Sequence, residues 1–98
     1  MRCLYSARAV DDFDGIAAFI ARDNPRRALS FVEELQARCE QLVRFPLAAP
    51  LRPEIADGIR AVPFGHYLIL YSVMGEQLIV ERILHGARDI VRLFDGDD

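Results

Sequence analysis

Lysine is absent from this sequence. All 12 of its basic residues are arginines, and with 15 acidic residues the formal net charge is −3. A chain with this acidic balance lacks the broad basic surface of a nucleic-acid-binding protein, so we expect no direct sequence-specific DNA binding by this chain. A local group of arginines can still bind an anion, and this leaves an anion-binding edge open as a function.

Cysteine is scarce as well. Cys3 and Cys39 lie far apart in the chain and match no metal-ligand spacing. No cluster of histidine, cysteine and aspartate has ligand spacing either. We therefore expect no metal, no cofactor and two buried free thiols, as in a cytoplasmic protein.

Long apolar runs are also missing. No segment approaches the ~20 apolar residues that cross a bilayer. The first residues, MRCLYSARAVDDF, contain no extended apolar region and no small-residue cleavage site, so they do not resemble a signal peptide. We expect a cytoplasmic protein without a membrane contact. The hydrophobic share is nevertheless 52%, which suggests that a partner covers part of the apolar surface.

The chain is long enough for one domain with one modest core. We expect a single domain at residues 1–95 and an acidic flexible tail at residues 96–98. Residues 2–5 suit a short strand, and Ser6 is placed to cap a helix. The apolar residues that follow recur at helical spacing: Val10, Phe13, Ile16, Ala17 and Ile20.

Acidic residues mark the start of this first helix. Asp11, Asp12 and Asp14 fall off the apolar stripe, and we expect them to form a solvated first turn. Asn24 and Pro25 then predict the start of a second helix, which runs to about Arg44. Its apolar stripe contains Ala28, Phe31, Val32, Leu35, Cys39, Leu42 and Val43.

The period changes after a proline-rich loop at residues 45–58. Residues 58–84 predict three short strands with turns near Gly65 and Gly75. The middle strand is apolar on both faces, which implies burial on both sides or burial of one side by a partner. A short helix follows Gly86. The order β-α-α-β-β-β predicts an α+β fold of two layers, with an N-terminal helical hairpin packed on a mainly antiparallel sheet.

These segments together resemble the ParE branch of the RelE/ParE toxin superfamily. The resemblance rests on the NP helix start at 24–25, the FP helix end at 45–46, Arg60 with Tyr67 and Tyr71, and LHGARD at 84–89. It implies a toxin of a type II toxin–antitoxin pair, neutralised by a cognate ParD-like or other DNA-binding antitoxin in a hetero-oligomer. ParE-like members inhibit DNA gyrase, whereas RelE-like members cut mRNA on the ribosome.

The resemblance to RelE-like nucleases is incomplete at the catalytic positions. RNA cleavage needs a base, an acid and cations that stabilise the phosphorane. Arg60 and Arg88 match the arginine positions of that branch, but Arg52 stands near the lysines and Phe94 replaces the terminal tyrosine. Arginine is a poor base and phenylalanine has no hydroxyl. A gyrase inhibitor is therefore favoured over an endoribonuclease, and an inactive antitoxin-binding module is a third possibility.

The candidate sites divide into two groups. The expected target contacts are Arg60, Arg82, His85 and Arg88; three of these, Arg60, Arg88 and His85, would serve a nuclease, and no catalytic residue is favoured. The expected antitoxin contacts are Phe13, Ile16, Ile20, Phe31, Leu35, Tyr67 and Tyr71.

Structural alternatives stay open for most of these residues. His85 suits a strand-end residue bonded to a loop carbonyl, and His66 suits a plain surface residue. Arg60 and Arg88 can form ion pairs with Asp57 and Asp89, and Arg82 can pair with an acid. Both tyrosines, Tyr67 and Tyr71, suit core positions whose hydroxyls reach an edge.

Overall fold

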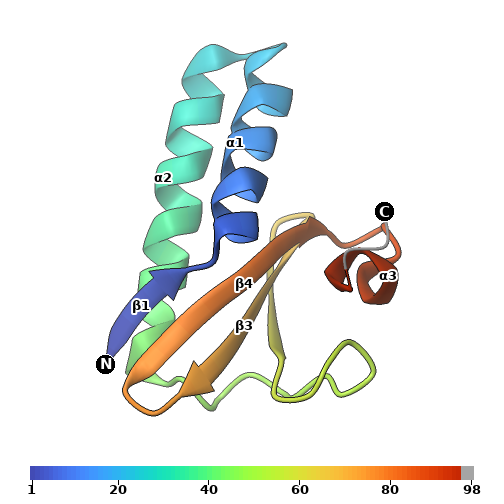
Figure 1. Ribbon diagram of the computed structural model, residues 1–98. Helices are drawn as coiled ribbons and strands as arrows, with labels where there is room; N and C mark the ends of the chain where they lie inside the picture. The colour runs from blue at the N-terminus through green and yellow to red at the C-terminus, as the bar shows by residue number, and fades with distance from the viewer. Residues whose placement is uncertain (96–98) are drawn as a thin grey trace.

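The computed structural model describes residues 1–95, and the acidic tail expected at residues 96–98 lies outside the described residues (Figure 1). The elements follow the predicted order, with one additional short 3₁₀ turn, η1, after the second helix. They are β1 (Arg2–Tyr5), α1 (Ala7–Ala21), α2 (Pro25–Gln41), η1 (Leu42–Arg44), β2 (Arg60–Phe64), β3 (Tyr67–Met74), β4 (Gln77–His85) and α3 (Ile90–Phe94).

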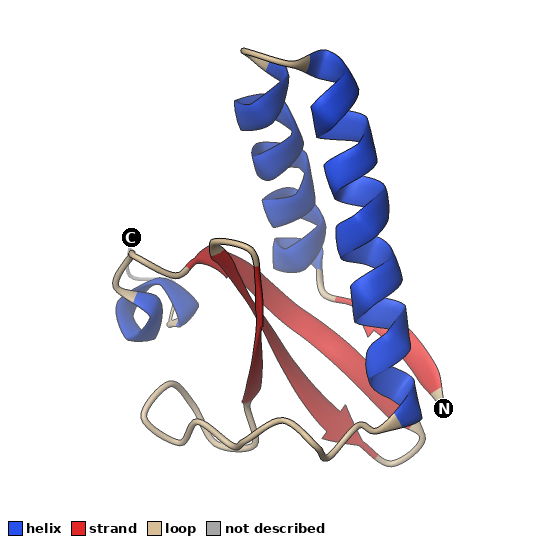
Figure 2. Ribbon diagram, turned by 180° about the vertical axis from the view of Figure 1, so that it is seen from behind, coloured by secondary structure: helices blue, strands red, loops and turns tan. Residues whose placement is uncertain are grey.

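The four strands form one sheet in the order β1-β4-β3-β2. The pairs β2–β3 and β3–β4 are antiparallel, and β1 runs parallel to β4. The hairpin of α1 and α2 covers one face of this sheet and extends beyond it, as both views show (Figure 1, Figure 2). The predicted α+β fold of two layers with a mainly antiparallel sheet is confirmed.

Both helix starts form where the sequence predicts them. The Ser6 hydroxyl accepts a hydrogen bond from the Ala9 N–H at 3.0 Å and donates one to the Glu81 carbonyl at 2.7 Å. Asn24 accepts a bond from the Arg27 N–H at 3.1 Å, and Pro25 occupies the first turn of α2. Each cap satisfies an amide that the helix itself leaves unpaired.

A β-bulge in β4 changes the face to which its side chains point. Leu70 pairs with Arg82 and Tyr71 pairs with Val80, so Glu81 is an extra residue in the ladder. Before the bulge Val80 packs under the helical hairpin, and after it Ile83 takes that side. The strict alternation expected for this strand is therefore wrong at one position.

The sheet has a core on each face. The hairpin side holds the larger cluster, built around Leu35, Cys39, Ile69, Tyr71, Leu78 and Val80. The opposite side holds a smaller cluster of Ile55, Ile59, Ala61, Leu70, Leu84 and Leu93. The two apolar faces predicted for β3 are confirmed. The chain itself covers the second face, with the 45–58 loop and α3, so no partner is needed there.

Side-chain hydrogen bonds fix the 45–58 loop to the sheet. The Tyr71 hydroxyl donates to the Pro46 carbonyl at 2.9 Å. Arg60 donates to the Leu47 and Ala49 carbonyls at 3.0 and 2.6 Å. These bonds bind the irregular backbone that closes the second core.

The two cysteines carry free thiols, as expected, although only Cys39 is buried and Cys3 is half-buried. Burial raises the pKa of Cys39 to about 12, and burial also raises the pKa of Cys3. No helix within residues 1–95 is both long and apolar enough to span a membrane.

A candidate binding cleft between α1, β4 and α3

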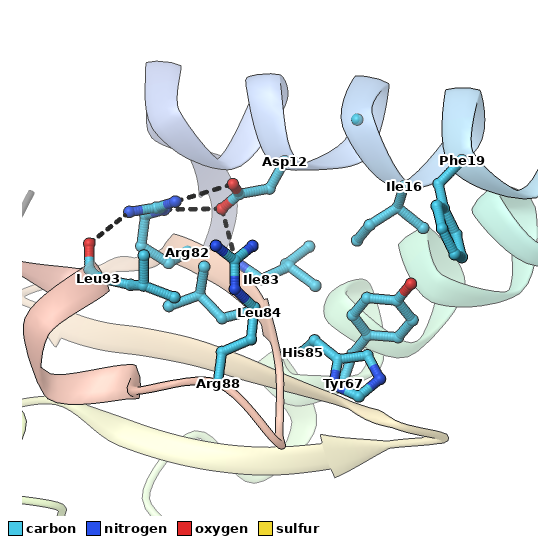
Figure 3. Close-up of a pocket in the computed structure, with 11 residues that line it drawn as sticks. Asp12, Ile16, Phe19, Tyr67, Arg82, Ile83, Leu84, His85, Arg88 and Leu93 are labelled. Carbon is cyan, nitrogen blue, oxygen red and sulfur yellow. Dashed lines mark hydrogen bonds and ion pairs between the residues drawn. The ribbon is translucent and has the colours of Figure 1, made fainter. Parts of the chain in front are cut away.

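The largest hollow in the described residues lies between α1, the end of β4 and α3 (Figure 3). It has a volume of about 440 Å³. We call it the α1–β4 cleft. Its walls combine apolar side chains with one acid, two arginines and a histidine, and the lining residues are Asp12, Gly15, Ile16, Phe19, Tyr67, Arg82, Ile83, Leu84, His85, Arg88 and Leu93.

Asp12 and Arg82 form the polar base of the cleft. The Arg82 guanidinium donates to both Asp12 carboxylate oxygens, at 2.8 and 3.0 Å, and the Ile83 N–H donates to the same carboxylate at 2.9 Å. The two side chains are only 14% and 10% exposed. The prediction that Asp12 belongs to a solvated first turn is therefore wrong, and the pairing of Arg82 with an acid is confirmed.

Burial also corrects the expected role of Arg82 in target binding. Arg82 is 8% exposed. Its third donor bonds the Leu93 carbonyl at 2.8 Å, which ties β4 to α3. Since its donors point to Asp12 and Leu93, its task in this conformation is to hold the cleft together. The pair stays inside because each charge is neutralised and hydrogen-bonded.

Arg8 closes the same corner from α1. Its guanidinium donates to the Leu93 and Phe94 carbonyls, both at 2.8 Å. These are carbonyls at the C-terminal end of α3, where positive charge is favourable. At the other end of α3, Asp89 is the N-cap and accepts the Arg92 N–H at 3.3 Å, one position earlier than the first-turn place expected for it.

His85 lies at the strand exit among aromatic rings. Its ring stacks on His66 at 6.0 Å and meets the Tyr67 ring edge-on at 5.4 Å. His85 Nδ1 accepts the Ala87 N–H at 3.2 Å, so this ring is neutral with its proton on Nε2. The expected bond to a loop carbonyl is not formed, and His66 is a stacking partner rather than a plain surface residue.

Arg88 is exposed, and its side chain points into the cleft (Figure 3). Within residues 1–95 it makes no side-chain hydrogen bond or ion pair. The expected alternative, an ion pair with Asp89, does not form because that carboxylate caps α3. Arg88 thus offers the cleft an uncompensated positive charge.

Arg60 is not part of the cleft. It pairs with Tyr71 in the sheet, whereas His85 pairs with Tyr67 at the far end of β3. Its guanidinium binds the loop carbonyls described above rather than Asp57. The structure therefore brings His85 and Arg88 together but leaves Arg60, the third residue of the expected nuclease set, elsewhere.

The expected antitoxin contacts are not equally accessible. Ile16, Leu35 and Tyr71 are buried, at 7%, 0% and 0% exposure, so in this conformation they serve the core and not an exposed surface. The half-buried members are Phe13, Ile20, Phe31 and Tyr67.

A second hollow lies where the helical hairpin meets β1. We call it the helix groove; it has a volume of about 240 Å³ and is lined by Tyr5, Val10, Phe13, Val32 and Gln36. Val10 is 48% exposed. Of these residues only Phe13 was expected to bind the antitoxin. Val10 and Val32 belong to the predicted apolar stripes, and that pattern is the signal that could have found them.

Comparison with known proteins decides the family. The family model described as the ParE toxin of the type II toxin–antitoxin system parDE matches residues 3–90. This chain belongs to the ParE toxin family. It is 32% identical over 89 residues to Toxin RelE1 of Caulobacter vibrioides, covering 85% of this chain and 90% of the relative.

The fold comparison agrees with the family. A chain from the structure titled "Chromosomal ParDE TA system from P. aeruginosa" matches with a TM-score of 0.77 at 20% identity. The match covers 87% of this ParE-family chain and 95% of the other chain. The fold predicted from the resemblance is thereby confirmed.

Proposed function

We propose that this ParE-family toxin acts by binding DNA gyrase, without catalysis, and that a cognate antitoxin neutralises it in the cytoplasm. The observation that carries the proposal is the composition of the α1–β4 cleft. Its acid, Asp12, is already neutralised by Arg82, and its uncompensated charge is the guanidinium of Arg88. Such a cleft suits recognition of an anionic group better than proton transfer.

The catalytic groups for RNA cleavage are not assembled around this cleft. Attack by a 2′-hydroxyl requires a base and an acid on opposite sides of the phosphate, with cations beside it. Arg88 stays protonated, Arg60 binds loop carbonyls, and Phe94 carries no ionisable group. His85 alone would have to act as both acid and base.

The helix groove supports the proposal of an antitoxin partner. Its lining is mostly apolar, and it runs between two helices, which suits the apolar face of a partner helix. The antitoxin would place apolar side chains on Phe13 and Val10, beside the half-buried Ile20 and Phe31 of the same hairpin. The named relatives belong to toxin–antitoxin systems, which agrees with such a partner.

A supercoiling assay tests the proposed target. Purified gyrase is incubated with relaxed plasmid and increasing amounts of the antitoxin-free protein. We expect supercoiling to stop, and to resume when the antitoxin is added. Unimpaired supercoiling at large excess of a protein that arrests growth in cells contradicts gyrase inhibition.

An endoribonuclease is the second candidate, because His85 and Arg88 share one cleft with Tyr67. Specific mRNA cuts in a translation extract, lost in His85→Ala, would establish it. Failure of the antitoxin-free protein to arrest growth would instead identify an inactive antitoxin-binding module.

A further inference from the structure

Gly15 lies within α1 and lines the α1–β4 cleft. Glycine inside a helix is less favourable than alanine because it loses more backbone freedom on folding. A Cβ atom built on Gly15 meets nothing within 4 Å, so packing within the chain does not exclude a side chain there. The position thus leaves helix backbone open to whatever enters the cleft.

The rest of the cleft offers a defined set of contacts around this opening. Phe19, one turn further along α1, is 63% exposed, although it is a large aromatic residue. The Tyr67 hydroxyl points toward α1 across the cleft (Figure 3). Arg88 supplies the uncompensated positive charge. An occupant that matches all of these features has an apolar side chain next to a carboxylate.

Charge separates this cleft from the helix groove. The groove presents no charged side chain among its lining residues, whereas the cleft presents Arg88 beside His85. Asp12 does not repel an acidic occupant because Arg82 neutralises it. Charge complementarity therefore assigns an acidic segment to the cleft and a plain apolar helix to the groove.

We infer that the α1–β4 cleft is the docking site for an acidic segment of the toxin's target protein. The segment packs an apolar side chain against the exposed backbone at Gly15 and places a carboxylate on Arg88. This inference rests on the proposed function for the target's identity, but the site is defined by the chain's own residues. The antitoxin, on the helix groove, binds without needing Gly15 or Arg88.

Three substitutions test the inference, each with a matched control. Gly15→Leu fills the opening, and Ala18→Leu adds the same bulk at an exposed position of α1 outside the cleft. Arg88→Glu reverses the cleft charge, and Arg26→Glu makes the same reversal at an exposed position in the first turn of α2. Gly15→Ala shows whether the glycine is kept for folding, because it should raise the thermal midpoint by roughly 2–8 °C.

The expected result is a separation of readouts. Gly15→Leu and Arg88→Glu should lose growth arrest and need roughly tenfold more protein to stop gyrase supercoiling, while they bind purified antitoxin like the wild type. Both controls should behave as wild type throughout. Arg88→Lys should keep part of the activity, since it keeps the charge.

The contrary results are equally distinct. Cleft variants that arrest growth like the wild type overturn the inference, and so do variants that lose antitoxin binding while arresting growth. If the wild type arrests growth without slowing supercoiling, gyrase is the wrong target, yet the growth assay still decides the cleft. A wild type that does neither overturns both.

Discussion

The α1–β4 cleft and the helix groove share one helix but differ in chemistry. Asp12, Gly15, Ile16 and Phe19 of α1 follow helical spacing and border the cleft, whereas Val10 and Phe13 border the groove. The cleft contains a buried ion pair and an exposed cation, and the groove is almost entirely apolar. One helix of 15 residues thereby presents two surfaces that suit two different partners.

The largest expected effect concerns the ion pair that supports the cleft. Asp12→Ala leaves Arg82 buried without its carboxylate and removes the acceptor for the Ile83 N–H. We expect a loss of about 3–5 kcal/mol in the free energy of unfolding. Asp14→Ala, at an exposed position of the same helix, should change it by less than about 0.5 kcal/mol. Urea unfolding of both variants measures the difference; similar small losses in the two would show that the pair does not hold the cleft.

The next effect separates the cleft wall from the groove. Leu93→Ala removes a side chain that is 7% exposed and fills the second core. We expect a loss of about 2–4 kcal/mol, while Val91→Ala on the outer side of α3 should lose about 1 kcal/mol or less. Antitoxin affinity should stay unchanged, because the groove does not contact α3. Weakened antitoxin binding in Leu93→Ala, measured below its unfolding midpoint, would argue against two independent surfaces.

A smaller effect belongs to the groove. Val10→Glu places a charge in an apolar site, and we expect antitoxin binding to weaken about tenfold, or about 1.4 kcal/mol. Gyrase inhibition should be retained, which is the reverse of the pattern expected for Arg88→Glu. Phe45→Glu, which changes a residue 74% exposed and outside both surfaces, is the control. Isothermal calorimetry with purified antitoxin gives the affinities, and an unchanged value for Val10→Glu would place the antitoxin elsewhere.

The smallest effect lies beneath the groove and depends on pH. Burial is the main cause that raises the pKa of Tyr5, Cys39 and Cys3 above their ordinary values. These groups are neutral in the folded state, so their contribution to stability is complete below the unfolded pKa of about 8.5 for cysteine and about 10 for tyrosine. It is lost as pH rises toward the folded values, because the unfolded chain releases its protons first.

Thermal unfolding between pH 7 and pH 11 measures this alkaline loss. Tyr5→Phe removes one of the buried ionisable groups, and its hydroxyl has no hydrogen-bond partner within residues 1–95. We expect this variant to lose less stability at high pH and to differ from the wild type by about 1 kcal/mol or less at pH 7. An identical alkaline profile for both proteins would show that Tyr5 is not one of the responsible groups.

Local features of the fold could be predicted from the sequence because they depend on neighbouring residues. Ser6, Asn24 and Pro25 fix the helix starts through amides three residues away or less. The two faces of β3 follow from its alternation. The ParE resemblance supplied the order and the pairing of these pieces.

The cleft could not be predicted, because long-range contacts create it. Asp12 and Arg82 are 70 residues apart, and a bulge at Glu81 sets the side to which the strand turns. Three neighbouring aspartates at a helix start favour a solvated turn, and only the fold brings one of them to a buried arginine. Leu35 and Tyr71 likewise looked available for a partner until the hairpin closed over them.

The stoichiometry of gyrase inhibition tests the central claim most directly. Supercoiling activity is measured at fixed gyrase while the antitoxin-free toxin is titrated from well below to well above the gyrase concentration. A toxin that acts by binding should end activity at a ratio on the order of one per target site, with no change on longer incubation. Inhibition that deepens with time at a small fraction of that ratio would indicate catalysis, and full activity at large excess would exclude gyrase as the target.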